Sequence, residues 1–275
     1  MIDNEQLKAK YCKEGSHLRC DQMELLRMLQ YLGKICDENG IQWWLSSGTL
    51  LGAARHEGFI PWDDDIDIVL LRKDFKRLEK ILHKLDSEEF VYHSMRSDCE
   101  YVNVYGKFRK REGVMVTGAR RYEYLKWKGQ FIDIFSIEKT SYIAARWSKV
   151  LYGNLQHATV YFKNKWVRRV MIKLVQFFCL VVCNTILRII GLYNPRGEYH
   201  YSLGSGWAPH TFYMKHTFPL TKAKFEGVEF PVPKDMDAYL TNVYGNWREI
   251  PTESVIKKSI HSETYRQEIF GEENK

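Results

Sequence analysis

The chain has 275 residues, of which 45% are hydrophobic and 27% charged, and its formal net charge is +7. These proportions are those of a globular protein, and the length suits one domain with an insertion or at most two small domains. The charge is moderate and no recognition motif is visible, so we predict no nucleic-acid partner.

The cysteines and the N-terminal stretch bear on the compartment. The six cysteines show no Cys-x-x-Cys pair and no matching histidine spacing, so we predict neither a zinc site nor a disulfide framework. The first residues, MIDNEQLKAKYCKEG, lack the apolar core of a secretory signal. We therefore expect a cytoplasmic protein.

Apolar spacing and turn residues predict alternating helices and strands. The first long helix has Asp21 as its expected N-cap and Asn39-Gly40 as its stop. In chain order, the predicted elements are helix 21–38, strand 41–45, helix 50–56, helix 74–85, strands 90–92, 101–109 and 130–135, and helix 234–244. Lys107 and Arg109 share one face of the 101–109 strand and could meet a donor phosphate. A solvated edge strand is the competing explanation, and it is favoured for Arg109.

The segment SSGTLLGAARHEGFIPWDDDIDIVL, residues 46–70, is the most informative part of the chain. Asp65-Ile66-Asp67-Ile68 has the period of a β-strand, so both carboxylates project from one face while the isoleucines enter the core. Two neighbouring carboxylates repel, and burying them unpaired would be costly. A divalent cation is the natural partner, and oxygen-only ligands suit Mg²⁺ or Mn²⁺.

The preceding acids, Asp63 and Asp64, have two explanations that the sequence leaves open. They can extend the metal site, Asp63 as a ligand or as support for the ligands, or they can form an acidic surface turn between a helix and a strand. That second explanation is much weaker for Asp65 and Asp67, which are embedded in isoleucine and valine.

A third acid, Asp133, interrupts the short apolar strand QFIDIF at residues 130–135. If this strand lies beside the Asp65/Asp67 strand, Asp133 completes a three-carboxylate site, the minimum for two-metal phosphoryl transfer. The competing explanation is that Asp133 sits at a strand edge and caps a turn.

A basic block lies between Ala144 and Arg196, which contains nine lysines and arginines and no acid. Inside it, the apolar run 174–187 is short for a membrane span, and Lys173, Asn184 and Arg188 interrupt any longer one. Two interpretations stay open. The insertion can dock on the anionic inner face of the plasma membrane, or it can be a buried core helix with a solvated basic face.

These motifs also resemble a known family. A Gly-Thr turn, an Asp-x-Asp strand and a later lone acid are similar to the polymerase-beta type of nucleotidyltransferase. The longer strings resemble one branch, the LicD family of phosphocholine transferases, related to fukutin and fukutin-related protein. The strings are GTLLGAAR at 48–55, GFIPWDDDID at 58–67, FEGVEFPVPKD at 225–235 and YLTNVYGNW at 239–247. The resemblance covers about residues 20–135 and 200–252.

This resemblance implies roles for individual residues. Asp65 and Asp67 would be metal ligands, with Asp133 as the third acid, and Gly48 and Thr49 would form the turn that approaches the donor phosphates. A turn with little side-chain bulk lets backbone N–H groups reach phosphate oxygens. Arg55 could neutralise the diphosphate, and so could His56, for which an ordinary surface role is equally open.

It also implies a fold and an activity. The expected fold is α/β (α+β), a polymerase-beta-like core with a mixed sheet flanked by helices, plus a basic, apolar helical insertion. Its parts would be a catalytic core at 20–140, the insertion at 141–198 and a C-terminal part completing the catalytic domain at 199–275. The expected reaction moves phosphocholine, or a similar phospho-alcohol, from a CDP-alcohol such as CDP-choline to a hydroxyl of a cell-surface glycan or its lipid-linked precursor. Lipopolysaccharide, teichoic acid and capsule are glycans of this kind.

Two other functions stay open. A nucleotidyltransferase would use the same acids to attach a whole nucleotide to an acceptor. A catalytically silent glycan- or membrane-binding protein could keep the scaffold without the chemistry, although the presence of all three acids argues against it.

Overall fold

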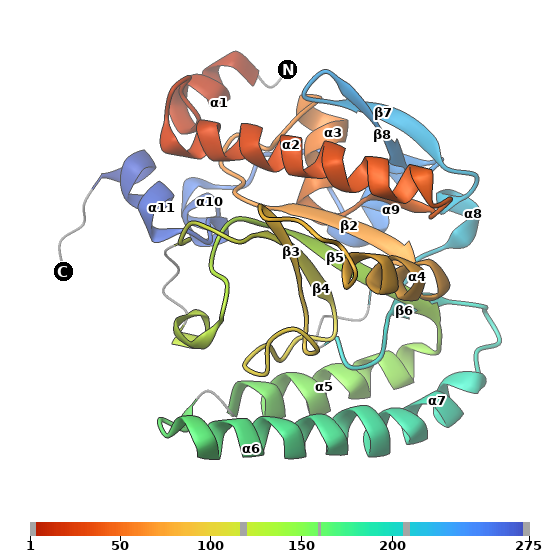
Figure 1. The fold of residues 1–275 in the computed structure, drawn as a ribbon. Coiled ribbons are helices and arrows are strands. Elements are labelled where there is room, and N and C mark those ends of the chain that lie inside the picture. Colours follow the sequence, from red (N-terminus) through yellow and green to blue (C-terminus); the bar gives the residue numbers. More distant parts are fainter. Residues whose placement is uncertain (1–3, 116–119, 159–160, 206–209, 272–275) are drawn as a thin grey trace.

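The computed structural model describes residues 4–115, 120–158, 161–205 and 210–271. In these ranges a mixed sheet is flanked by helices, as expected (Figure 1). The helices are α1 Asn4–Tyr11, α2 His17–Glu38, α3 Ser47–His56, α4 Arg72–Leu82, α5 Tyr142–Ala158, α6 Lys165–Gln176, a π-helical segment Phe177–Cys183, α7 Asn184–Leu192, α8 Met214–Thr217, α9 Met236–Tyr244, α10 Glu253–Ser259 and α11 Glu263–Phe270, with a short 3₁₀ helix at Arg120–Tyr124. The strands are β1 Trp43–Leu45, β2 Ile66–Leu71, β3 Phe90–His93, β4 Gly106–Lys110, β5 Phe131–Lys139, β6 Tyr199–Tyr201, β7 Thr221–Phe225 and β8 Val228–Val232.

The order of strands in the main sheet is β1-β2-β5-β4-β3. β2 and β5 are parallel, and the other pairs are antiparallel. β6 also pairs with β5, beyond the end of β4, so the chain returns to the main sheet after the helical insertion. The predicted division into a core, an insertion and a C-terminal part, with boundaries at 140 and 198, stays a prediction.

Helices lie on two sides of this sheet. In Figure 1, α2 and α4 lie in front of the strands, and α5 with the long helix formed by α6, the π-helical segment and α7 lies below them. The inward faces of the central strands are apolar: Ile66, Ile68, Ile132 and Ile134 are all fully buried. Their burial supplies the hydrophobic stabilisation that holds β2 against β5.

Several element boundaries differ from the predictions. α2 begins at His17 rather than after Asp21, because Ser16 caps it by accepting the N–H of Arg19, and it ends at Asn39 as predicted. The predicted strand at 101–109 is wrong in its first half, since β4 begins only at Gly106. The predicted helix at 234–244 is confirmed as α9, but α10 and α11 follow it.

The explanation of this segment as a solvated edge strand is wrong. β4 lies between β3 and β5, and the side chains of Lys107 and Arg109 are both buried. The Arg109 guanidinium donates to the main-chain carbonyl of Gly129 at 2.5 Å and stacks on the Phe131 ring. Arg109 is therefore part of the interior of the sheet.

The end of α3 is held close to the loop that leads to the acids, and this gives a stability prediction. A Cβ at Gly52 would lie 2.4 Å from the carbonyl oxygen of Gly58 and 3.1 Å from the amide nitrogen of Ile60. Because both atoms are backbone, Gly52→Ala should lower the free energy of unfolding by about 3 kcal/mol. Urea denaturation measures this loss.

Gly48→Ala, in the same helix, is the matched control. A Cβ at Gly48 would meet only the carboxylate of Asp63, at 2.7 Å, and a side chain can rotate away. Its stability should therefore stay close to that of the wild type. Because alanine has a higher helix propensity than glycine, propensity alone predicts no loss in either variant. Equal losses in the two variants would show that the close approach of the Gly58 and Ile60 backbone does not set the requirement for glycine at position 52.

Candidate active site

The register of three neighbouring strands places the predicted acids in one row. Asp67 of β2 pairs with Asp133 of β5, and Asp133 pairs with Lys107 of β4. Paired residues of adjacent strands project from the same face of the sheet. Asp65 lies two residues before Asp67, just ahead of β2, and therefore projects from that face as well.

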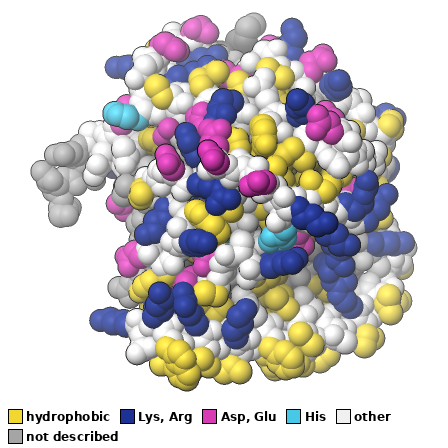
Figure 2. Space-filling view, viewed as in Figure 1, with side chains coloured by type: hydrophobic (Ala, Val, Ile, Leu, Met, Phe, Trp, Pro, Cys, Tyr) yellow, Lys and Arg dark blue, Asp and Glu magenta, His cyan; other side chains and the backbone are white. Residues whose placement is uncertain are grey.

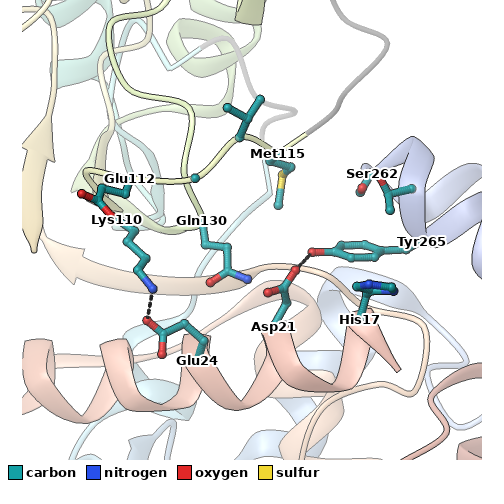
Figure 3. Close-up of a pocket in the computed structure, with 12 residues that line it drawn as sticks. His17, Asp21, Glu24, Lys110, Glu112, Met115, Gln130, Ser262 and Tyr265 are labelled. Atoms are coloured by element: carbon teal, nitrogen blue, oxygen red, sulfur yellow. Dashed lines mark hydrogen bonds and ion pairs between the residues drawn. The ribbon is translucent and has the colours of Figure 1, made fainter. Parts of the chain in front are cut away.

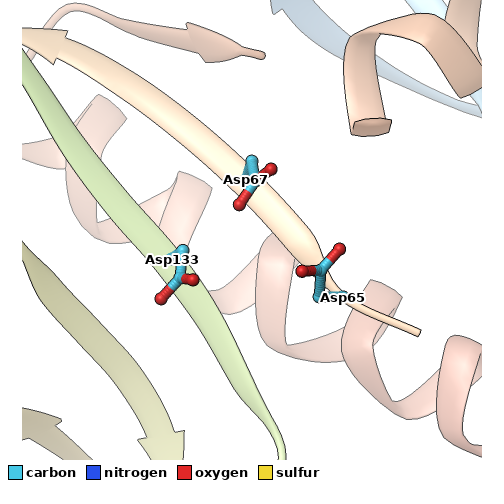
Figure 4. A group of neighbouring side chains, drawn as sticks. All are labelled: Asp65, Asp67 and Asp133. Carbon is cyan, nitrogen blue, oxygen red and sulfur yellow. The ribbon is translucent and has the colours of Figure 1, made fainter. Parts of the chain in front are cut away.

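The three carboxylates converge, as the sequence predicted. Asp65, Asp67 and Asp133 each present an oxygen, and these oxygens lie within 4.8 Å of one another (Figure 4). Asp133 is 6% exposed and is flanked on both sides by paired strands, so the explanation that it caps a turn at a strand edge is wrong. Three carboxylate oxygens at this spacing fit a hard divalent cation such as Mg²⁺ or Mn²⁺.

Without a cation, the protein disfavours the charged forms of Asp65 and Asp67. Burial, together with the charges of Asp64 and Asp133, raises the pKa of Asp65 to about 6. Burial and the neighbouring charges of Asp65 and Asp133 also raise the pKa of Asp67 well above its ordinary value. A group of carboxylates whose pKa values rise in this way is typical of a functional site, where a cation relieves the repulsion.

These shifts predict an opposite pH response with and without metal. Asp65 titrates near pH 4 in the unfolded chain and near pH 6 in the folded one. Its contribution to stability is therefore complete below about pH 4 and is lost as the pH rises through about 6. In thermal melts of metal-free protein, the melting temperature should fall between about pH 5 and pH 8 relative to that of Asp65→Asn, which lacks the titrating carboxyl group. Mg²⁺ should raise it more at the higher pH, because binding requires ionised carboxylates. A metal effect that is equal at both pH values would contradict this assignment.

Lys107 reaches the acid cluster directly. Its Nζ donates to Asp133 Oδ1 at 2.5 Å, and both side chains are buried. The same ammonium group lies 3.3 Å from the centre of the Phe131 ring, so it is held by an aromatic face as well as by the carboxylate. Lys107 balances part of the negative charge, while its contact with a donor phosphate stays a prediction.

Gly48 and Thr49 lie in the first turn of α3 rather than in a separate turn before the helix. The Thr49 hydroxyl accepts the main-chain N–H of Asp67 at 2.8 Å, and the Ser46 N–H donates to the Asp67 carbonyl at 3.0 Å. The start of α3 therefore fixes the position of Asp67. Gly48 packs closely against the Asp63 side chain, since a Cβ at this position would lie 2.7 Å from Asp63 Oδ2. The predicted contact of this segment with donor phosphates is not tested by these bonds.

Arg55 lies at the other end of α3. Its Nη1 donates to the main-chain carbonyls of Trp247 and Glu249, at 3.1 and 3.2 Å, and so holds the C-terminal segment against α3. Its Nε donates to the ring of the neighbouring His56, which is buried, and burial lowers the pKa of His56 to about 4. His56 is therefore a neutral, buried group and not a surface one. The role of Arg55 toward a diphosphate stays a prediction.

Asp64 is fully buried, so it does not belong to a solvated surface turn. Its carboxylate accepts the main-chain N–H groups of His261 and Ser262, at 3.1 and 2.8 Å, and the Nδ1–H of His261 at 3.0 Å. Asp64 thus anchors the segment between α10 and α11 beside the acid cluster.

Asp63 is half-buried, and burial together with the charges of Asp65 and Asp64 raises its pKa well above the ordinary value.

His261 is the residue of the site that sequence reasoning missed. Its Nδ1 lies 3.7 Å from Asp65 Oδ2, and the hydrogen bond to Asp64 raises the pKa of His261 to about 10. The imidazole is therefore a cation beside two acids, and over half of its side chain is exposed. Nothing in the surrounding string SIHSETY marks a site residue, and only the tertiary fold brings it to the acids.

A separate pocket of about 550 Å³ lies between α2, α11 and the loop after β4. Figure 3 shows its lining: Asp21 faces the hydroxyl of Tyr265, and Lys110 pairs with Glu24. Asp65, Asp67 and Asp133 do not line it. Ser262 lines the pocket, so the segment that Asp64 anchors forms one of its walls.

Comparison with known proteins agrees with this geometry. Residues 40–182 match the family model described as LicD/FKTN/FKRP, nucleotidyltransferase domain. The lipopolysaccharide cholinephosphotransferase LicD of Haemophilus influenzae is 25% identical over 273 residues, which span 90% of this chain and 97% of that protein. Shorter matches cover 62 residues of human ribitol 5-phosphate transferase FKRP and 49 residues of mouse ribitol-5-phosphate transferase FKTN. The match to FKRP is 36% identical and spans 22% of this chain and 12% of FKRP. The match to FKTN is 41% identical and spans 18% of this chain and 11% of FKTN. The family model covers more than half of the sequence, including all three converging acids, and the chain therefore belongs to the LicD family.

Proposed function

We propose that this protein transfers a phospho-alcohol group, phosphocholine from CDP-choline, to a hydroxyl of a cell-surface glycan or its lipid-linked precursor. That the protein is a phosphotransferase follows from its family, whose similar members carry cholinephosphate or ribitol phosphate in their names. The observation that carries the proposal is the convergence of Asp65, Asp67 and Asp133 on one sheet face.

The metal requirement is part of this proposal. Asp65, Asp67 and Asp133 would hold Mg²⁺ or Mn²⁺, which when bound neutralises the charge of the donor diphosphate and of the reacting phosphoryl group. The spacing of the three oxygens and the raised pKa values of Asp65 and Asp67 support this role. Lys107, bonded to Asp133, adds a fixed positive charge at the same place.

The residues around the cluster would position the donor. The first-turn N–H groups of α3, at Gly48 and Thr49, lack partners within the helix and are suited to bind phosphate oxygens. Arg55 would contribute charge from the far end of the same helix. Attack of the acceptor hydroxyl on the choline-side phosphorus forms the new P–O bond, breaks the bond to the bridging oxygen and releases CMP.

A cytoplasmic location, where CDP-alcohols would be available, belongs to the same proposal.

The transferred head group is the point at which relatives differ, because their names specify choline in one case and ribitol in another. Phosphate-binding residues do not distinguish these alcohols, so we base the choice of phosphocholine on the relative that spans 90% of the chain.

Product analysis tests the proposal. The purified protein is incubated with Mg²⁺, a glycan acceptor and, in turn, CDP-choline, CDP-ethanolamine, CDP-ribitol or CTP. We expect CMP and a phosphocholine-labelled glycan from CDP-choline. Pyrophosphate release from CTP, with a nucleotide on the acceptor, would instead identify a nucleotidyltransferase. No turnover, together with no Mg²⁺-dependent binding of CDP-choline in calorimetry, would favour a non-catalytic binding protein.

A further inference from the structure

The helical insertion presents an apolar surface that the rest of the protein does not cover. Residues 165–192 form one helix long and apolar enough to cross a membrane, although only 28% of its most apolar stretch is buried. The apolar run predicted at 174–187 is thus part of a longer helix, about 42 Å in length at 1.5 Å per residue. A buried core helix is one of the two predictions for this segment, and only one side of the helix is buried.

Burial and exposure alternate along this helix with helical spacing. The inward side consists of Arg168, Ile172, Cys179, Cys183, Leu187 and Gly191, all of them buried. The outward side is also apolar, and Trp166, Phe177 and Ile189 on it are 73%, 63% and 65% exposed. A helix that is apolar all round belongs in a core or in a membrane, and this one has a core on one side only. We call the outward side, residues 166, 170, 174, 177, 178, 181, 186 and 189, the apolar face.

Basic residues border the apolar face. Lys165, Arg169 and Lys173 follow one another at four-residue spacing along α6, and all three are exposed. Arg146 and Lys149 are exposed on the neighbouring helix α5. Figure 2 shows hydrophobic side chains along the bottom of the molecule, where α6 and α7 lie, and Lys and Arg side chains in a band above them. An apolar surface rimmed by positive charge complements an anionic lipid leaflet.

Aromatic residues extend this pattern to the ends of the helix. Tyr161, Trp166 and Tyr193 are 74%, 73% and 80% exposed, and Trp147 of α5 is 51% exposed. Tryptophan and tyrosine favour the headgroup region of a bilayer, because their rings are apolar and their N–H or O–H groups are polar.

The inward contacts decide how the helix can meet a membrane. Near one end, the buried Arg168 donates to Glu100 at 2.8 Å, and further along the Asn184 amide donates to the Leu203 carbonyl at 3.2 Å. Arg188 pairs with Glu138 of β5 at 3.0 Å. The helix is therefore fixed lengthwise to the catalytic domain, and crossing a bilayer would bury these charged groups in hydrocarbon.

We propose that the apolar face lies flat in the interfacial layer of an anionic membrane, with the basic border on the lipid headgroups. This docking does not depend on the proposed reaction, because it involves neither the metal site nor the donor. If the acceptor is lipid-linked, docking holds the catalytic domain at the surface where that acceptor is displayed.

Vesicle flotation of the full-length protein, without metal or donor, tests the proposal. One variant combines Trp166→Gln, Phe177→Gln and Ile189→Gln, and a second combines Lys165→Glu and Lys173→Glu. All five positions are exposed, so both variants should fold, which circular dichroism checks. Val255→Gln, at an exposed apolar position on α10, is the matched control.

We expect wild type and control to float with phosphatidylglycerol vesicles and to bind at least tenfold less to phosphatidylcholine vesicles. The glutamine variant should lose at least tenfold in binding to both. The glutamate variant should lose binding mainly to the anionic vesicles. High salt should weaken the binding of the wild type to these vesicles in the same way, because it screens the attraction between charges.

Other outcomes would overturn the proposal. Equal flotation of the wild type and both variants would show that the apolar face does not bind the membrane. Resistance of membrane-bound protein to alkaline carbonate would identify a spanning helix instead. A third outcome is that the wild type binds no vesicles and is a dimer in sedimentation velocity, while the glutamine variant is a monomer. The apolar face would then be the contact with a second copy of the chain. Transfer to a water-soluble acceptor, measured in parallel, reports on the proposed function separately.

Discussion

Asp67→Asn is expected to lower the transferase rate by at least ~10³-fold while the protein stays folded. The substitution keeps the size of the side chain but removes the charge that a cation needs, and cation stabilisation of a reacting phosphoryl group contributes several kcal/mol, with about 1.4 kcal/mol for each tenfold in rate. Because the pKa of Asp67 is raised well above its ordinary value, the charge is unfavourable in the metal-free protein. The variant should therefore melt at a higher temperature than the wild type without Mg²⁺ and should gain less from adding it.

Asp37→Asn, an exposed aspartate in the last turn of α2, is the control and should retain the wild-type rate. Initial rates of CMP release at saturating CDP-choline, with and without Mg²⁺, measure the effect. If Asp67→Asn keeps more than about a tenth of the activity, Asp67 is not an essential metal ligand, and the assignment of the cluster fails.

The second large effect is on stability. Asp64→Ala should lower the free energy of unfolding by about 3 kcal/mol, because it leaves the buried N–H of Ser262 and the part-buried N–H of His261 without the carboxylate that accepts them. The segment between α10 and α11 would lose its attachment beside Asp65. We expect activity to fall together with stability, and urea denaturation monitored by tryptophan fluorescence measures the latter.

Two further variants separate the contacts of Asp64. Asp64→Asn keeps one acceptor oxygen and should cost less than Asp64→Ala. His261→Gln keeps both main-chain donors and removes only the imidazole that is bonded to Asp64. Its loss of stability should be smaller than that of Asp64→Ala and reports the contact of the imidazole with Asp64, while its effect on rate reports the role of the imidazole in the reaction. If Asp64→Ala is as stable as the wild type, the anchoring role is wrong.

The sequence predicts the acids well, because each of them breaks a local pattern. Asp65 and Asp67 alternate with isoleucines, and Asp133 interrupts an apolar run, so each is a charge in a strand that otherwise enters the core. The sequence alone does not show that β2 and β5 are neighbours. The parallel register that sets Asp67 opposite Asp133 is tertiary information, and the structure supplies it.

The parts that could not be predicted depend on contacts between distant segments. His261 reaches the site through a bond to Asp64 that spans 197 residues, and nothing near it in sequence announces a role. The hydroxyl of Thr49 accepts the N–H of Asp67, 18 residues further along the chain, and the local sequence does not announce this contact. Arg109 looks like a solvated residue because it is charged, but its place between two paired strands buries it.

The insertion shows a different limit of sequence reasoning. Periodicity identifies residues 174–187 as apolar, but an apolar residue facing the core and one facing outward look the same in sequence. Only the packing of Arg168, Asn184 and Arg188 against the catalytic domain shows which side of the helix is left open. The two interpretations of this helix could not be separated before its inward contacts were known.

The central claim is that Asp65, Asp67 and Asp133 together hold a divalent cation next to the donor diphosphate. Anomalous diffraction from crystals grown with Mn²⁺ and CDP-choline tests it most directly. The account predicts an anomalous peak about 2.1–2.2 Å from an oxygen of each carboxylate, with the donor phosphates beside it. Bound CDP-choline with no peak between these three side chains, or with manganese and diphosphate at another place in the protein, would contradict it.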